Sequence, residues 1–251
     1  MTLLALDSVS KSFGGVTAVA GLSLSVAPGR ITGLIGPNGA GKTTVLNLIT
    51  GMHRATAGTI RFRGADVTAL APHRRARAGM GRTFQNIRLL NEASVLDNVV
   101  IGFHRHETTS LLANLLGLPA AGRERRRLTG EAQALLERFG MAHFARQPAG
   151  SLSYGHQRRL EIIRALATGP DLLLLDEPVA GMNDVEAEEL AAILRQIAAG
   201  GPGLLVIEHN MRFVMALCEV VHVLDAGRLI ASGPPAAVYD DPQVVAAYVG
   251  D

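Results

Sequence analysis

The feature that most constrains this chain is a glycine-rich segment, Gly36-Pro37-Asn38-Gly39-Ala40-Gly41-Lys42-Thr43. It fits the pattern G-x-x-x-x-G-K-[ST] in full. The segment follows Arg30–Ile35, whose residues predict a strand, and it runs into Lys42–Ile49, which has helical character. A strand, a glycine-rich turn and a helix in this order are the context in which this pattern builds a phosphate-binding loop.

Each part of this phosphate loop has a physical reason to be there. Glycine lets the backbone curl so that successive N–H groups face inward as an anion-binding nest, and the N-terminus of the following helix adds about half a positive charge. Lys42 can reach the β- and γ-phosphates, and the Thr43 hydroxyl can ligate Mg²⁺. Lys42 is one of only two lysines in the chain, which favours a specific role over an ordinary glycine-rich turn. The residues expected around the phosphates are Gly36, Asn38, Gly39, Ala40, Gly41, Lys42, Thr43 and Thr44.

Two carboxylates follow a second apolar strand, Leu172–Leu175. This run and Leu204–Ile207 do not alternate in polarity, and a helical stretch separates them, so both are expected to be parallel strands buried on two faces. Ligands bind at the carboxyl edge of such a sheet. We expect Asp176 to hold Mg²⁺ through its water shell and Glu177 to polarise the attacking water in phosphoryl transfer. The alternative is that the two acids only end a strand in a loop.

Composition limits the class of protein. The chain has 251 residues, of which 48% are hydrophobic and 18% charged, which excludes a disordered chain. Its net charge of +2 is too small to attract nucleic acid by bulk electrostatics. The single cysteine, Cys218, cannot form an internal disulfide, which fits a cytosolic compartment. Two basic runs, at 73–77 and 123–127, are interpreted as solvated surface.

The region between these motifs, residues 86–164, is predicted to be mostly helical. Ala132, Leu135, Leu136 and Phe139 recur with helical spacing and form one apolar face. Ser153 stands where it would cap the helix that follows it. From these residues alone, an ordinary capped helix remains as good an interpretation as a ligand site. Further expectations are a hairpin late in the chain, with strands at Val220–Leu224 and Leu229–Ala231, and a short helix over Pro242–Val249.

Taken together and in this order, the motifs resemble the ATP-binding subunits of ABC transporters. They are the phosphate loop, Gln85, Leu-Ser-x-Gly at 152–155, Leu-Leu-Leu-Leu-Asp-Glu-Pro at 172–178, and His209. The resemblance covers essentially the whole chain. It implies an α/β fold: a P-loop NTPase (RecA-like) core with a mostly parallel sheet, an N-terminal antiparallel β part and an inserted helical subdomain. It further implies one cassette over 1–251, with the nucleotide-binding core at 1–85 and 165–235, the helical subdomain at 86–164, and a C-terminal tail at 236–251.

The resemblance also implies roles for single residues. Phe13 occupies the position that stacks on adenine, although by its sequence context alone it could equally be a core residue. Gln85 matches the glutamine that contacts Mg²⁺ or water, or else is a polar loop side chain. His209 matches the histidine near the γ-phosphate. Ser153 and Gly155 match the signature that binds the γ-phosphate held by a second subunit, so that two ATP molecules lie between two chains.

This sequence departs from the family pattern in two segments. Tyr154 and His156 stand within and after the signature. The sequence Gly-Met-Asn at 181–183 stands where many relatives carry Ala-Leu-Asp, and the uncharged Asn183 puts a salt bridge across the dimer there in doubt.

Residues 82–85, 180–183 and 207–211 are similar to the ATPase of branched-chain amino-acid importers, and 179–182 also to urea and short-amide importers. The implied partners are permease subunits, a second ATP-binding subunit that is either self or a paralogue, and indirectly a solute-binding protein, with the chain peripheral at the cytoplasmic face of the membrane. The rival is a soluble nucleic-acid- or ribosome-associated ABC protein. That rival fits less well, because such proteins usually carry two cassettes, and we expect no nucleic-acid partner. The sequence favours ATP over GTP, because neither lysine lies in the Asn-Lys-x-Asp motif by which P-loop GTPases of that type recognise guanine.

Overall fold

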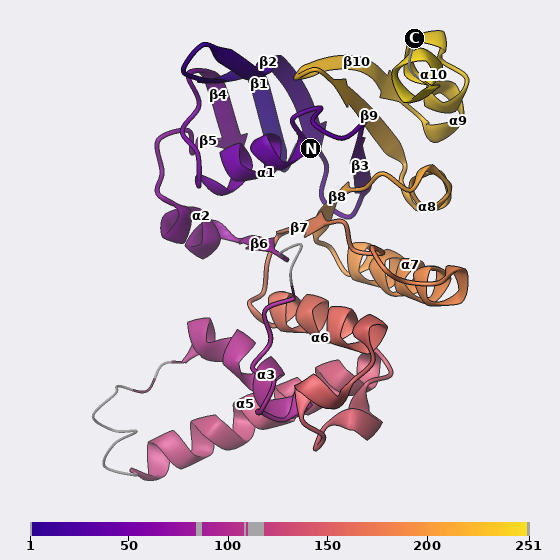
Figure 1. Cartoon of the computed structure of the whole chain (residues 1–251). Helices are drawn as coiled ribbons and strands as arrows, with labels where there is room; N and C mark the ends of the chain where they lie inside the picture. The colour runs from indigo at the N-terminus through magenta and orange to yellow at the C-terminus, as the bar shows by residue number, and fades with distance from the viewer. Residues whose placement is uncertain (1, 84–86, 108, 110–117, 250–251) are drawn as a thin grey trace. The chain divides into compact units, whose positions relative to one another are not determined.

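The computed structural model describes residues 2–83, 87–107, 109 and 118–249 (Figure 1). The chain divides into two compact units. The first unit consists of Met1–Gln85 and Asp171–Asp251, and the second is Asn86–Pro170. The second unit therefore ends at Pro170, later than the residue 164 expected from the sequence.

An antiparallel sheet in the first unit has the strand order β2-β1-β4-β5. Strands β1 (Leu4–Phe13) and β2 (Val16–Val26) form a hairpin around the turn at Gly14 and Gly15. Both are longer than the strands at Leu3–Val9 and Ser23–Val26 that the apolar patterns of the sequence predict. Strands β4 (Ala57–Phe62) and β5 (Ala65–Asp66) form a second hairpin. This sheet shares a buried core with the first helix of the chain.

The other sheet in the first unit has the order β10-β9-β3-β8-β7-β6. Its central strands, β3 (Ile31–Ile35), β8 (Gly203–Ile207) and β7 (Leu172–Asp176), are parallel and buried at every position, as the apolar runs predict. Strands β6 (Met80–Arg82) and β9 (Val220–Asp225) extend the parallel order, and β10 (Arg228–Gly233) pairs antiparallel with β9 as the late hairpin. The expected α/β class, with a mostly parallel sheet and an antiparallel N-terminal part, is confirmed.

The direction of these strands decides where the candidate site lies. Ile207 of β8 pairs with Leu34 of β3 on one side and with Asp176 of β7 on the other. The loops that follow β3, β7 and β8 therefore leave the sheet at the same edge. These three loops carry the phosphate loop, Glu177 and His209.

The first unit's helices are α1 (Lys42–Thr50), α2 (Pro72–Ala78), α7 (Asp184–Ala199), α8 (Met211–Leu217), α9 (Pro235–Tyr239) and α10 (Pro242–Val249). The expected helix in the tail is thus confirmed. Asn183 has a local task at the start of α7: its side chain accepts a hydrogen bond from the Glu186 N–H, and the Glu186 carboxylate accepts one from the Asn183 N–H. This capping box satisfies amides that a helix start otherwise leaves unpaired.

The second unit is built from α3 (Val95–Gly102), α5 (Pro119–Arg138) and α6 (Tyr154–Ala167), with short 3₁₀ turns at Phe103–His106, Ala142–Phe144 and Ala149–Ser151. Helix α3 packs against both α5 and α6. Ala132, Leu136 and Phe139 of the predicted apolar face are buried, and Leu135 is half-buried. None of the helices in the described ranges is both long and apolar enough to cross a bilayer.

The two basic runs behave differently. The arginines of Arg123–Arg127 are exposed on α5, which confirms the surface interpretation for that run. For the run at 73–77 the interpretation is wrong at Arg75, whose side chain is only 1% exposed. Its guanidinium donates to the carbonyls of Leu48 and Ile49, at 2.6 and 2.8 Å, and also to Leu70 and Thr68. A cation at these last carbonyls of α1 satisfies groups that a helix end leaves unpaired and faces the negative end of its dipole.

Candidate functional site

The phosphate loop takes a path that only glycine permits at two points. At Gly36 the backbone φ is 149°, and a Cβ atom there would lie 1.9 Å from the Leu224 carbonyl oxygen. At Gly41 φ is 102°, and a Cβ would lie 2.5 Å from the Ala18 carbonyl oxygen. Neighbouring strands thus hold the loop closely, and the Gly227 N–H adds a hydrogen bond to the Ala40 carbonyl at 3.0 Å.

Helix α1 begins directly after Gly41, which has no side chain to cap the amides of the first turn. That turn opens with Lys42, Thr43 and Thr44 and contains no acidic residue. Asn38, Gly39 and Thr43 are exposed, so this helix start is open to solvent. Uncapped amides at the positive end of a helix dipole form a site for an anion such as a phosphate.

The Lys42 ammonium is folded back over the loop. Its Nζ donates to the carbonyls of Gly36 at 2.7 Å and Pro37 at 2.9 Å, and the residue is buried. Burial lowers the pKa of Lys42, and the carboxylates of Glu177, Asp176 and Glu208 oppose this shift. The Lys42 ammonium expected to bind a phosphate therefore lies within electrostatic range of Asp176 and Glu177, the carboxylates expected to act in its hydrolysis.

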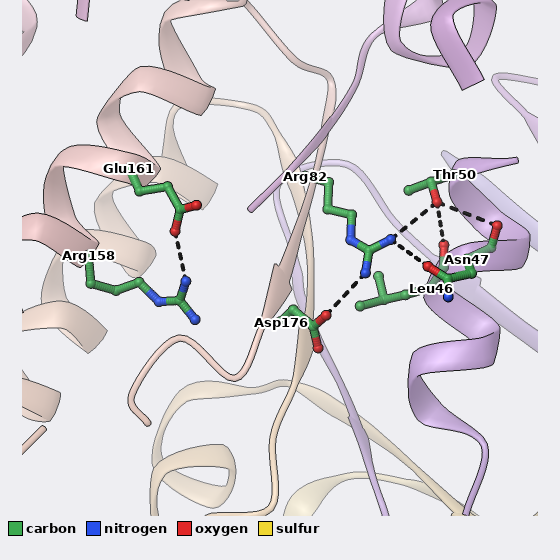
Figure 2. Close-up of polar contacts among 7 residues, drawn as sticks. All are labelled: Leu46, Asn47, Thr50, Arg82, Arg158, Glu161 and Asp176. Carbon is green, nitrogen blue, oxygen red and sulfur yellow. Dashed lines mark hydrogen bonds and ion pairs between the residues drawn. The ribbon is translucent and has the colours of Figure 1, made fainter. Parts of the chain in front are cut away.

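Asp176, at the end of β7, is buried and paired with Arg82 of β6. Figure 2 shows the Arg82 guanidinium between Asp176, at 3.1 Å, and Asn47 of α1, at 2.8 Å. A second bond, of 3.4 Å, reaches Thr50. Arg82 thereby fixes one carboxylate oxygen of Asp176 and ties two strands to the helix that carries the phosphate loop.

Glu177 has an unusual backbone conformation. Its φ is 47°, in the left-handed region that costs an L residue about 1–2 kcal/mol. The Glu177 N–H donates to the Ile207 carbonyl at 2.9 Å, which joins the ends of β7 and β8. His209, in the next loop, places its Nδ1 3.8 Å from a carboxylate oxygen of Glu177. The expected carboxylate and histidine are thus brought together at one edge of the sheet.

Phe13 lies at the end of β1 and is 44% exposed. The Lys11 ammonium sits 4.7 Å from its ring centre, and the His53 ring meets it edge-on at 5.1 Å. The alternative that Phe13 is a core residue is therefore wrong. An exposed aromatic face beside a cation is suited to stacking on a flat ligand.

Ser153 caps α6 in the second unit, as expected. The His156 N–H points to its Oγ at 3.4 Å, and the Oγ lies 2.8 Å from the His156 Nδ1. The His156 ring, one of the departures from the family pattern, thus contacts the hydroxyl of the signature serine. Gly155 is buried in the first turn.

Further along α6, Arg158 and Glu161 form a buried ion pair of 2.7 Å, also drawn in Figure 2. Gln85, the remaining predicted site residue, lies outside the described residues.

Sequence reasoning did not single out several residues that shape this site. Arg82 and Glu208 stand in the sequence only as parts of family-like segments, and each has partners far along the chain: Asn47 and Asp176 for Arg82, and Val179 for Glu208. Tyr248 of α10 was placed in a tail. Its hydroxyl is buried, and burial raises the pKa of the phenol, a shift that the backbone of Gly36 opposes. No local pattern in the sequence could have revealed contacts of this range.

A comparison with known families gives the site its context. The sequence profile of the ABC transporter family matches residues 19–180, which include the phosphate loop, Ser153 and Asp176. The chain belongs to the ABC transporter family. The match covers all of the second unit and part of the first unit of the ABC cassette, and it ends just beyond Glu177.

Individual members of the ABC transporter family align over the full length. The chain is 40% identical to the high-affinity branched-chain amino acid transport ATP-binding protein BraF of Pseudomonas aeruginosa, over 99% of this chain and 98% of BraF. It is 38% identical to the lipopolysaccharide export system ATP-binding protein LptB of Acidithiobacillus ferridurans, over 99% and 97%. Its fold matches the crystal structure of the ADP conformation of MJ1267, an ATP-binding cassette of an ABC transporter, with a TM-score of 0.87, 34% identity and complete coverage of both chains.

Proposed function

We propose that this protein is the ATP-binding and ATP-hydrolysing subunit of an importer for branched-chain amino acids or similar small polar solutes. The observation that carries the proposal is the meeting of the phosphate loop, Asp176, Glu177 and His209 at one edge of the parallel sheet. The full-length identity to BraF supports the substrate class. LptB, which belongs to an export system, is almost as similar to this chain as BraF. A transport assay is therefore the decisive test of the substrate class.

The loop and its neighbours bind the nucleotide. The open amides of the first turn of α1 hold the β- and γ-phosphates, and Lys42 turns from the loop carbonyls toward them. The exposed ring of Phe13 stacks on the adenine. Thr43 offers an exposed hydroxyl and Asp176 a carboxylate oriented by Arg82, a set of oxygen donors that fits Mg²⁺. When bound, Mg²⁺ neutralises charge on the β- and γ-phosphates. Gln85 completes this set in the proposal.

The chain's own groups then direct hydrolysis. Glu177 orients the attacking water and accepts its proton, and His209 holds the γ-phosphate beside it. Ser153 and Gly155 of a second ATP-binding subunit close over the far side of the same phosphate, because a helix N-terminus with a hydroxyl suits an anion. Two nucleotides lie between two subunits, which bind permease subunits from the cytoplasmic face. A solute-binding protein acts indirectly, and nucleic acid is no partner.

Replacing Glu177 by Gln tests the catalytic part. We expect turnover to fall at least about 100-fold, because the amide cannot take the proton from the water. Binding of ATP should remain, and light scattering should show a dimer that persists with ATP. Glu188→Gln, at an exposed position on α7, is the control that keeps full turnover. Normal hydrolysis by Glu177→Gln would contradict the proposed role.

Transport tests the substrate class. Proteoliposomes containing the chain, its copurified permease and binding protein should take up leucine, isoleucine or valine when ATP is supplied. Uptake only of urea or short amides would assign the subunit to that kind of importer. Copurification with ribosomes or nucleic acid in place of membrane proteins would overturn the importer proposal.

A further inference from the structure

Glu208 is a buried acid placed between the two loops that carry the proposed catalytic groups. It follows β8, directly before His209, and it is 0% exposed. Glutamate is almost never fully buried unless it is paired. The hydrogen-bond partners of this carboxylate are backbone amides from two separate parts of the chain, and the His209 Nδ1 lies 3.8 Å from its Oε2.

The two oxygens of the carboxylate bind different loops. Oε1 accepts the Val179 N–H at 3.0 Å, in the loop after β7. Oε2 accepts the N–H groups of His209 at 3.2 Å and Asn210 at 3.5 Å, in the loop after β8. Only a carboxylate presents acceptors on both sides, since an amide of the same size carries N–H donors on one of them.

Glu177 lies between two such cross-links. On one side its own N–H is bound to Ile207, and two residues later Val179 is bound to Glu208. A non-glycine residue at a φ of 47° persists only where its surroundings determine its conformation. The hydrogen bond from the Val179 N–H to Glu208 supplies such a constraint on the C-terminal side of Glu177.

Starting helix α8 is not a sufficient reason for this arrangement. The Asn210 side chain already caps α8 by accepting the Phe213 N–H at 3.1 Å. The bond from Glu208 to Val179 reaches a different loop altogether and contributes nothing to that helix.

We propose that Glu208 is a positioning residue that fixes the Glu177 loop against the His209 loop, so that both side chains address the same phosphate. This inference rests on the roles proposed above for Glu177 and His209. Burial raises the pKa of Glu208, and its three backbone hydrogen bonds oppose that shift. Glu208 touches no reacting atom; it acts through the backbone of the two loops and through the His209 ring, whose Nδ1 lies 3.8 Å from the Glu208 Oε2.

The test compares Glu208→Gln with Glu208→Asp in the purified full chain. Gln keeps the size but loses an acceptor on one side, whereas Asp keeps both acceptors on a shorter side chain. We expect kcat for ATP to fall about 10- to 100-fold in Glu208→Gln and less in Glu208→Asp. The KM for ATP and the affinity for nucleotide should stay within about twofold, since the phosphate loop is intact. Glu188→Gln again serves as the unaffected control.

Several outcomes would overturn the inference. A role in packing alone gives the reverse order, with Gln more active than Asp. Unchanged kcat in both variants, or a parallel loss of kcat and nucleotide affinity, also contradicts it. Should Glu208→Gln not fold, hydrogen exchange of the wild-type Val179 amide decides: slow exchange supports the constraint from Glu208, and exchange at the rate of an exposed loop refutes it. If Glu177→Gln is inactive while both Glu208 variants are normal, only this inference fails; if Glu177→Gln is active, the proposed function fails.

Discussion

The buried polar side chains of the two units differ in how far along the chain they reach. In the second unit, Asn98 and Arg158 each make hydrogen bonds to close neighbours. Asn98 bonds to the backbone of Leu90 and Ser94, eight and four positions away. Arg158 bonds to Glu161, three positions away. Each of these contacts stabilises one helix or the turn that leads into it.

In the first unit three buried polar side chains join segments far apart in sequence. Arg75 reaches Leu48 across 27 positions, and Arg82 reaches Asp176 across 94. Glu208 reaches Val179 across 29. Such bonds cross-link strands and loops whose relative positions make the candidate site. These three long-range bonds therefore fix the geometry of the site, whereas the bonds of Asn98 and the Arg158–Glu161 pair support local helix structure.

The largest expected effect is in the second unit. Arg158→Met removes the guanidinium that pairs with the buried Glu161 carboxylate, and breaking a buried pair from one side costs about 3 kcal/mol or more. Urea unfolding measures the loss. Hydrogen exchange should rise in α6 and in the helices packed on it, and the parallel sheet should keep its protection. Replacing both residues with methionine should restore most of the stability.

Arg125→Met, at an exposed position on α5, is the matched control for that experiment. Faster hydrogen exchange in β3 and β7 of the first unit after Arg158→Met would show that this ion pair is not local to the second unit.

Arg75→Met should have a somewhat smaller effect of about 2 kcal/mol, because the variant leaves backbone carbonyls without a donor but leaves no buried charge behind. The loss should appear in two distant segments at once, the end of α1 and the loop from Thr68 to Leu70. Exposed Arg74→Met is the control. A change confined to α2 would show that Arg75 acts only locally.

The smallest expected effect concerns pH and His222 of β9. This residue is buried, with its Nδ1 2.9 Å from the Ser232 Oγ. Burial lowers the pKa of His222, and the backbone of Ser25 opposes the shift only in part. The unfolded chain therefore binds this proton more readily. The stability that neutral His222 gives is complete above about pH 6.5 and declines as the pH falls below that value.

Comparing the wild type with His222→Gln isolates this contribution. The unfolding free energy of the wild type should decrease relative to the variant by at most about 1.4 kcal/mol per pH unit below pH 6.5. Parallel pH profiles for the two proteins would show that burial in the folded chain does not hold His222 neutral.

Much of the fold and site follows from local sequence. The phosphate loop, the two acids after an apolar strand and the Ser153 cap rest on spacing over a few residues, and non-alternating apolar runs predict parallel strands. The lengths of β1 and β2 were underestimated, because irregular pairing with register shifts carries them past Val9 to the turn at Gly14 and Gly15. The prediction that residues 73–77 are all solvated is wrong at Arg75, because a run of basic residues gives no sign in the sequence that one side chain is buried.

The sequence by itself determined the local chemistry of this protein: where an anion can bind, which acids follow β7, and that Ser153 caps the helix after it. Only the tertiary structure decided which of its charged residues are buried and what they hold together. The physical reason is that Arg75, Arg82 and Glu208 are stabilised by partners from other helices, strands and loops. A buried charge is tolerated only where such partners converge, and that convergence exists only once the chain has folded.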